Sequence, residues 1–195
     1  MKTDIILAGV GGQGILSIAA AIGLAAIENN LFIKQAEVHG MSQRGGDVQS
    51  NLRISDKEIA SDLIPFGNAD IILAIEPMES LRYLPYLSRN GRIVTNSAPF
   101  INILDYPEIE TVLDEIRKNP DNIIIDADII AKNIGSPRSS NMVMLGAASH
   151  FINIKFESIE NAVMKMFASK GNEVAEINVK ALQAGREASK KMING

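Results

Sequence analysis

A glycine-rich turn between an apolar run and a long apolar helix constrains the fold of this chain more than any other feature. Residues 5–8 are all apolar, which is typical of a strand buried on both faces of a parallel sheet. The sequence AGVGGQGIL covers residues 8–16, and residues 15–29 read as a helix rich in Ala, Ile and Leu. A strand, a glycine loop and a helix in this order predict an α/β fold.

The segment after this helix departs from a plain alternation of strands and helices. Residues 31–38 predict a second strand that completes a βαβ unit, whereas residues 48–54 alternate between side chains for two faces. Turn residues 55–57 lead into 58–61, so we expect an antiparallel hairpin there. We further expect strands at 71–75, 91–96 and 123–125. We expect a brief helix that ends at Asn133 and is capped by Asp126 or Asp128. The other expected helices are 77–87, 107–119 beginning with Pro107, 140–151, 158–169 capped by Ser158, and 174–192.

Length, charge and cysteine content limit what the chain can be. Its 195 residues suit a single domain, residues 1–195, with no linker or repeat. The net charge of −4 argues against nucleic acid as the main partner, because binding phosphates along a duplex needs a basic face. The absence of cysteine excludes disulfides and cysteine-ligated iron–sulfur clusters from this chain. With no signal-peptide layout and no apolar stretch near the roughly 20 residues of a membrane span, we expect a cytoplasmic protein with no membrane association.

The glycine loop predicts an anion site. Backbone N–H groups at a helix N-terminus are open to a phosphate, and the helix dipole favours it, so Gly11, Gly12, Gln13 and Gly14 are candidate phosphate-binding residues. The alternative is a tight turn whose glycines serve close packing only. Glu37 follows Gly14 by 23 positions and could bind the ribose hydroxyls of a dinucleotide, or else be a partner for Arg44 or a partly exposed strand end.

A second motif, EVHGMSQRGGD at residues 37–47, lies between two predicted strands, on the side of the sheet where open α/β folds bind ligands. Arg44 offers a planar fork of donors to a phosphate or carboxylate, and Ser42 and Gln43 can add neutral hydrogen bonds. Gly45 and its neighbour Gly46 allow a close approach of backbone to ligand. A surface loop with a structural arginine is the alternative.

Together the two motifs, GVGGQG and HGMSQRGG about 30 residues later, resemble the gamma-type subunit of the 2-oxoacid:ferredoxin oxidoreductases. The likeness is greatest to the small (beta) subunits of the indolepyruvate type, and it extends to NADIILAIEPMESLRYLPYL and to NMVMLGA at residues 141–147. The resemblance implies a Rossmann-like three-layer α/β/α sandwich, similar to domain III of pyruvate:ferredoxin oxidoreductase, with a mostly parallel sheet plus an antiparallel hairpin.

The resemblance also implies a reaction. A 2-oxoacid and coenzyme A (CoA) give acyl-CoA, carbon dioxide and reduced ferredoxin, and this chain completes the active site and binds CoA as co-substrate. Thiamine diphosphate and the iron–sulfur clusters are then expected on a large partner (alpha) subunit, through which the complex meets ferredoxin. The isolated chain would be inactive, and whether it forms a homodimer is left open. The alternatives are a free-standing Rossmann-type oxidoreductase that uses NAD(P) or FAD, and a nucleotide-binding regulator.

The remaining candidates are weaker. His39 is the one histidine inside a motif and is a weak candidate for acid–base catalysis. Asn141 is a candidate hydrogen-bond partner of the ligand or of its loops, whereas we expect His150 to be a core or interface residue. No spacing of His, Asp and Glu predicts a metal site. Four methionines should pack in the core or in a subunit interface: Met142, Met144, Met164 and Met166.

Overall fold

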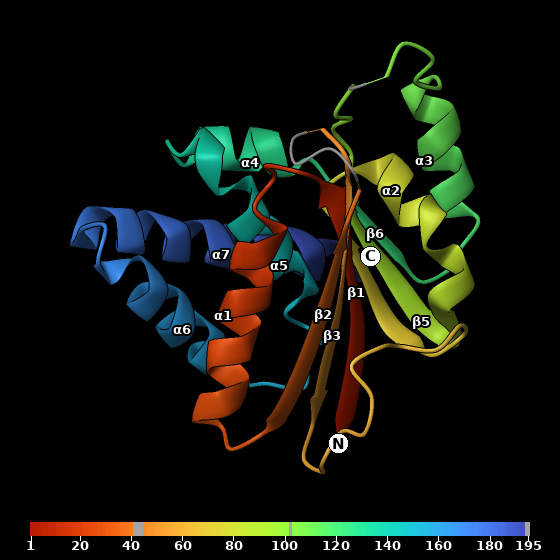
Figure 1. The fold of residues 1–195 in the computed structure, drawn as a ribbon. Coiled ribbons are helices and arrows are strands. Elements are labelled where there is room, and N and C mark those ends of the chain that lie inside the picture. The colour runs from red at the N-terminus through yellow and green to blue at the C-terminus, as the bar shows by residue number, and fades with distance from the viewer. Residues whose placement is uncertain (41–44, 102, 194–195) are drawn as a thin grey trace.

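A mixed sheet of six strands lies at the centre of the computed structural model, which describes residues 1–40, 45–101 and 103–193 (Figure 1). The strand order is β2-β3-β1-β4-β5-β6. β1, β4, β5 and β6 pair in parallel, and β3 runs antiparallel between β1 and β2. The predicted sheet, mostly parallel with an antiparallel hairpin, is confirmed. The strands are β1 (Lys2–Val10), β2 (Phe32–His39), β3 (Asp47–Ser55), β4 (Ala69–Ala74), β5 (Leu87–Asn96) and β6 (Asn122–Ile125).

The position of the hairpin was predicted wrongly. β3 pairs with β2 on one side and β1 on the other, so residues 58–61 find neither of its edges available and form no strand. Instead the guanidinium of Arg53 donates to the carbonyl oxygens of Ser61 and Leu63, at 3.1 and 3.0 Å. The βαβ prediction is also only partly right, because β2 runs parallel to β1 but β3 separates the two strands.

Helices cover both faces of the sheet and make three layers (Figure 1). The larger layer packs on one face around the main apolar core, and the smaller layer packs on the opposite face. Among the described residues no helix is long and apolar enough to cross a bilayer. The larger layer holds α1 (Ile15–Glu28), α4 (Ala127–Asn133), α5 (Ser140–Ala148), α6 (Phe156–Ala168) and α7 (Asn172–Ile193), and the smaller one α2 (Pro77–Arg82) and α3 (Ile109–Arg117).

Several helix boundaries differ from prediction, and α5, for example, ends at Ala148 rather than at residue 151. α2 ends at Arg82 and a 3-10 turn (Leu84–Tyr86) follows, because Pro85 has no N–H and disfavours helical backbone in the residue before it. α3 begins at Ile109 behind Glu108, two residues after the predicted start. α6 begins at Phe156 behind Lys155, so the predicted capping serine lies inside its first turn. Asp126 caps α4 as expected, because its Oδ1 accepts the Ile129 N–H at 2.8 Å.

Two glycines let α5 and α7 meet at backbone contact. A Cβ on Gly146 would lie 1.9 Å from the carbonyl oxygen of Leu182, and one on Gly185 would lie 1.9 Å from that of Val143. Backbone cannot yield at such distances, so only glycine fits at either position. This close contact holds α5 with its N-terminus directed to the same edge of the sheet as the glycine loop, which Asn141 contacts (Figure 1).

Candidate functional site

The candidate site lies at the carboxyl end of β1, whose neighbour β4 ends at the same edge of the sheet. From β1 the chain leads to α1 on one face of the sheet, and from β4 it leads to α2 on the other (Figure 1). This divergence to opposite faces marks the position in the topology where open α/β folds bind their ligands. The predicted glycine loop therefore stands at the position that the topology favours for a ligand.

The loop has the backbone geometry that only glycine adopts readily. Gly12 has φ of +102° and Gly14, the residue before α1, has φ of +83°. The side chain of Gln13 points back to the strand, because its Oε1 accepts the Val10 N–H at 2.8 Å. The Gln13 N–H donates to the Val10 oxygen at 3.1 Å, so this residue shapes the loop as well as belonging to it.

Several backbone donors of the glycine loop have no hydrogen-bond acceptor in the part of the chain that the structure describes. Within the described part of the chain, the N–H groups of Gly12 and Gly14 make no hydrogen bond, whereas that of Gly11 donates to Gly46 at 2.9 Å. Ile15 and Leu16 begin α1, where backbone N–H groups lack intrahelical acceptors. Among residues 1–40, 45–101 and 103–193 no side chain caps this helix, and its first turn contains no acidic residue. The loop thus presents several donors and the positive end of a helix dipole to an anion.

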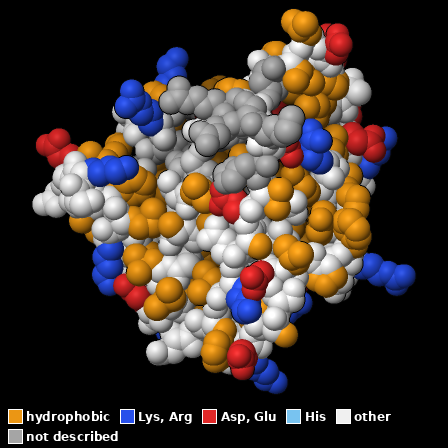
Figure 2. All heavy atoms as spheres, in the orientation of Figure 1, with side chains coloured by type: hydrophobic (Ala, Val, Ile, Leu, Met, Phe, Trp, Pro, Cys, Tyr) orange, Lys and Arg blue, Asp and Glu red, His pale blue; other side chains and the backbone are white. Residues whose placement is uncertain are grey.

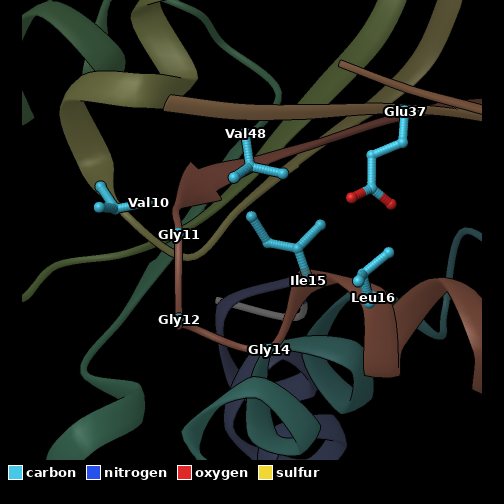
Figure 3. Close-up of a pocket in the computed structure, with 8 residues that line it drawn as sticks. All are labelled: Val10, Gly11, Gly12, Gly14, Ile15, Leu16, Glu37 and Val48. Atoms are coloured by element: carbon cyan, nitrogen blue, oxygen red, sulfur yellow. The ribbon is translucent and has the colours of Figure 1, made fainter. Parts of the chain in front are cut away.

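A cavity of about 270 Å³ adjoins these donors (Figure 3). Its size is near the lower end for ligand pockets, which suits part of a ligand rather than a whole cofactor. Figure 3 shows the Glu37 carboxylate on the opposite wall from Ile15 and Leu16. The cavity is lined by Val10, Gly11, Gly12, Gly14, Ile15, Leu16, Glu37 and Val48.

Glu37 lies farther from β1 than a dinucleotide fold would place it. In that fold the acidic residue that binds ribose ends the strand next to the glycine-loop strand. Here β3 separates β2 from β1, so Glu37 is two strand spacings away from β1, roughly 9–10 Å. Glu37 lines the same cavity as the glycine loop, but because β3 is inserted, it does not lie on the strand next to β1 as the ribose-binding acidic residue of a dinucleotide fold does.

The second motif meets the first through its described ends. Gly46 accepts the Gly11 hydrogen bond, and Gly40 N–H donates to the Asp47 oxygen at 2.9 Å. Gly45 has φ of +79° beside this junction. His39 is the last residue of β2 and pairs with Val48. Ser42, Gln43 and Arg44, together with Met41 and the side chain of His39, lie outside the described residues, so their binding or catalytic roles stay predictions.

Asn141 contacts the glycine loop from the start of α5. Its Nδ2 donates to the Gly14 oxygen at 3.2 Å, and a Cβ on Gly14 would lie 2.5 Å from that nitrogen. The side chain is 8% exposed, so its place beside the loop is fixed by packing. Of the two roles predicted for Asn141, the structure bears out contact with the loop.

Other predicted residues lie away from the loop. His150 follows α5, and its Nε2 hydrogen-bonds the Arg186 carbonyl at 3.0 Å. Among the methionines, Met142 and Met144 are fully buried, whereas Met164 is 37% exposed. No group of three or more metal-ligating side chains gathers anywhere in the described ranges.

Sequence reasoning missed a cluster of buried carboxylates at the end of β4. Glu76 is 1% exposed, caps α2 by accepting the Glu79 N–H at 2.9 Å, and also accepts the hydroxyl of Tyr106. Burial raises the pKa of Glu76 above its ordinary value, against the opposing effect of these hydrogen bonds. Glu79 in turn holds Arg82 through two contacts, at 2.7 and 3.1 Å. The sequence signal that could have identified this capping residue is Glu76 directly before Pro77, the first residue of α2.

Comparison with known proteins gives consistent matches over nearly the whole chain. Residues 4–188 match the family described as pyruvate ferredoxin/flavodoxin oxidoreductase. Indolepyruvate oxidoreductase subunit IorB from Archaeoglobus fulgidus is 36% identical over 194 residues, which cover 95% of this chain and 94% of that relative.

Solved structures share the fold. A keto/oxoacid ferredoxin oxidoreductase gamma subunit from Geobacter sulfurreducens superposes with a TM-score of 0.71 at 23% identity, over 97% of this chain and 99% of that one. The 2-oxoglutarate:ferredoxin oxidoreductase from Magnetococcus marinus, solved with 2-oxoglutarate, CoA and succinyl-CoA bound, superposes with a TM-score of 0.77 at 23% identity. The match covers 97% of this chain but 31% of that longer one. These likenesses establish the predicted three-layer fold.

Proposed function

This chain belongs to the pyruvate ferredoxin/flavodoxin oxidoreductase family, and we propose that it is the gamma-type small subunit of a 2-oxoacid:ferredoxin oxidoreductase. Its identity of 36% to an indolepyruvate oxidoreductase subunit, along nearly the full length of both chains, supports an aryl pyruvate such as indolepyruvate as the 2-oxoacid. In this reaction the 2-oxoacid loses carbon dioxide, its acyl group passes to the thiol of CoA, and the electrons released reduce ferredoxin.

The open N–H donors of the glycine loop are the observation that carries a role in CoA binding. CoA brings phosphate groups, and the backbone of Gly12 and Gly14 together with the start of α1 offers donors that find no acceptor among the described residues. The Magnetococcus relative with this fold was solved with CoA and succinyl-CoA bound. In this proposal Arg44, Ser42, Gln43 and Gly45 of the second motif complete the phosphate contacts.

The redox groups belong to a partner in this proposal. Cysteine is absent from the chain, so it cannot ligate an iron–sulfur cluster through thiolates. A large chain that carries thiamine diphosphate and the clusters would complete the enzyme and pass electrons to ferredoxin. The Magnetococcus protein supports this division, because the part of it that matches this chain makes up 31% of its length.

One observation favours the alternative of a dinucleotide-binding oxidoreductase. Glu37 lines the same cavity as the glycine loop, and a carboxylate there can accept hydrogen bonds from ribose hydroxyls. Its distance of two strands from β1 argues against that geometry, and the family match argues for CoA.

Titration of the purified chain and of its complex with CoA, and separately with NAD, tests the proposal. We expect saturable binding of CoA and none of NAD. Arg44→Ala should weaken CoA binding about tenfold, because a charge-assisted contact to phosphate is lost. Arg89→Ala is the matched control: this exposed arginine lies at the opposite edge of the sheet and should leave binding unchanged.

Co-purification tests the assembly. The tagged chain, isolated from its native host, should bring a larger protein with iron–sulfur absorbance. A preparation with no such partner contradicts the subunit assignment. Tight NAD binding with no CoA binding would favour the alternative oxidoreductase instead.

A further inference from the structure

The segment between β5 and α3 rises from the same edge of the sheet as the glycine loop and arches over to α3, and residues 97–101 and 103–108 of it are described (Figure 1). We call these residues the β5–α3 segment. Its apolar side chains face outward: Ile101 is 71% exposed and Leu104 is fully exposed. Figure 2 shows hydrophobic side chains gathered at this projecting corner. A segment with so little apolar burial needs other contacts to hold one position.

Glu76 supplies those contacts. Its Oε1 accepts the hydroxyl of Tyr106 and the N–H of Phe100 at 3.4 Å, one near each end of the segment. Its Oε2 accepts the Glu79 N–H, which ties the same carboxylate to α2. Three donors therefore converge on a side chain that is 1% exposed. Only an acceptor with no hydrogen to donate suits all three.

Glu76 is also level with the glycine loop. Ala8 of β1 lies opposite Ala74 of β4, so Glu76 and Val10 each come two residues after a matched pair. The residue that anchors the segment thus follows β4, the strand next to β1, at the same edge of the sheet as the glycine loop.

We propose that Glu76 is a positioning residue that holds the β5–α3 segment beside the glycine loop, where the segment forms a wall for the extended arm of CoA. This inference rests on the proposed function. The arm that joins the CoA phosphates to its thiol is long and combines apolar groups with amides. A cavity of about 320 Å³ on the segment, lined by Ile101, Leu104 and Tyr106 among others, offers it apolar contacts and a hydroxyl.

Kinetics of the assembled complex test the proposal. Tyr106→Phe keeps the ring and removes one of the three donors, so we expect the KM for CoA to rise about tenfold with the KM for the 2-oxoacid and kcat unchanged. Glu76→Gln places an NH₂ group among donors and should raise the KM for CoA further, whereas Glu76→Asp should recover part of the loss. Tyr86→Phe is the control, since the described residues give its hydroxyl no hydrogen-bond partner.

Hydrogen exchange of the full chain separates this inference from the proposed function, because it needs neither CoA nor the partner. The Phe100 amide should be protected in the wild type and in Tyr86→Phe, and should exchange at least tenfold faster in Tyr106→Phe. Equal exchange and an equal KM for CoA in both variants would overturn the positioning role. A proportional rise of both KM values with a fall in kcat would also overturn it, as a general structural effect. Wild-type complex with protected Phe100 but no CoA-dependent turnover would instead refute the proposed function.

Discussion

The two ends of β1 differ in how their polar groups are paired. Near its start, Asp4 is completely buried and is paired with Arg53 through two contacts of 2.9 Å and with Lys2 at 2.8 Å. At its far end the chain enters a glycine loop whose N–H donors at Gly12 and Gly14 meet no acceptor among the described residues. The charged side chains at the start of β1 are thus paired with one another, whereas the backbone donors at its end remain available to a ligand.

The difference separates stability from function along one strand. Arg53 also ties down residues 61–63, so the paired end fixes the antiparallel strand and the loop after it. The paired end holds β1 in place, while the other end is a glycine turn whose open N–H donors are available to a ligand. If this comparison is right, changes at the start of β1 cost stability without changing ligand affinity, whereas changes at its end also weaken ligand binding.

The largest effect is expected from Asp4→Asn. It leaves Arg53, whose side chain is 14% exposed, without its opposing charge, and breaking one side of a buried ion pair costs about 3–5 kcal/mol. In urea denaturation we expect a loss of about 3 kcal/mol, with CoA affinity unchanged in the protein that remains folded. Glu28→Gln removes the surface pair with Lys165 and should cost less than about 1 kcal/mol. Equal losses in the two variants would remove the contrast between the ends of the strand.

Local patterns predicted much of this architecture. The apolar runs of β1, β4 and β6 and the glycine loop were recognisable because each is encoded by consecutive residues. The family resemblance drawn from two motifs is confirmed by the match over residues 4–188. The hairpin was placed wrongly because the alternation in β3 reveals a strand but not its neighbours, which β1 and β2 decide.

Contacts distant in sequence were beyond prediction. Asp4 and Arg53 are separated by 49 residues, and Glu76 and Tyr106 by 30. No periodicity within either segment signals its partner, because these contacts depend on strand order and on the path of a loop. Asn141 was predicted to contact the ligand or its loops, but its donation to Gly14, 127 residues away, needed the folded arrangement of α5.

An intermediate effect is expected from Gly14→Ala, at the open end of β1. The backbone has φ of +83°, which costs a non-glycine residue about 1–2 kcal/mol, and the new Cβ would lie 2.5 Å from the Asn141 amide. We expect about 2 kcal/mol less stability and a loss of CoA affinity. Gly67→Ala is the matched control, with φ of +71° and open space around the position. Gly67→Ala should lose about 1 kcal/mol of stability through its backbone conformation and keep its CoA affinity. Equal losses of stability and of CoA affinity in the two variants would show that the contact with Asn141 does not contribute to the effect at Gly14.

The smallest effect concerns pH and refines the comparison at the strand beside β1. Burial raises the pKa of Glu76 above its ordinary 4.5 even though three donors face the carboxylate. Between pH 4.5 and the raised pKa the folded chain retains a proton that the unfolded chain has released, so this group's contribution to the free energy of unfolding falls as pH rises. The stability of the wild type minus that of Glu76→Gln should therefore decline across this window and stay level above it. A difference that rises with pH would mean that the hydrogen bonds outweigh burial, in which case the end of β4 would resemble the satisfied start of β1 rather than its open end.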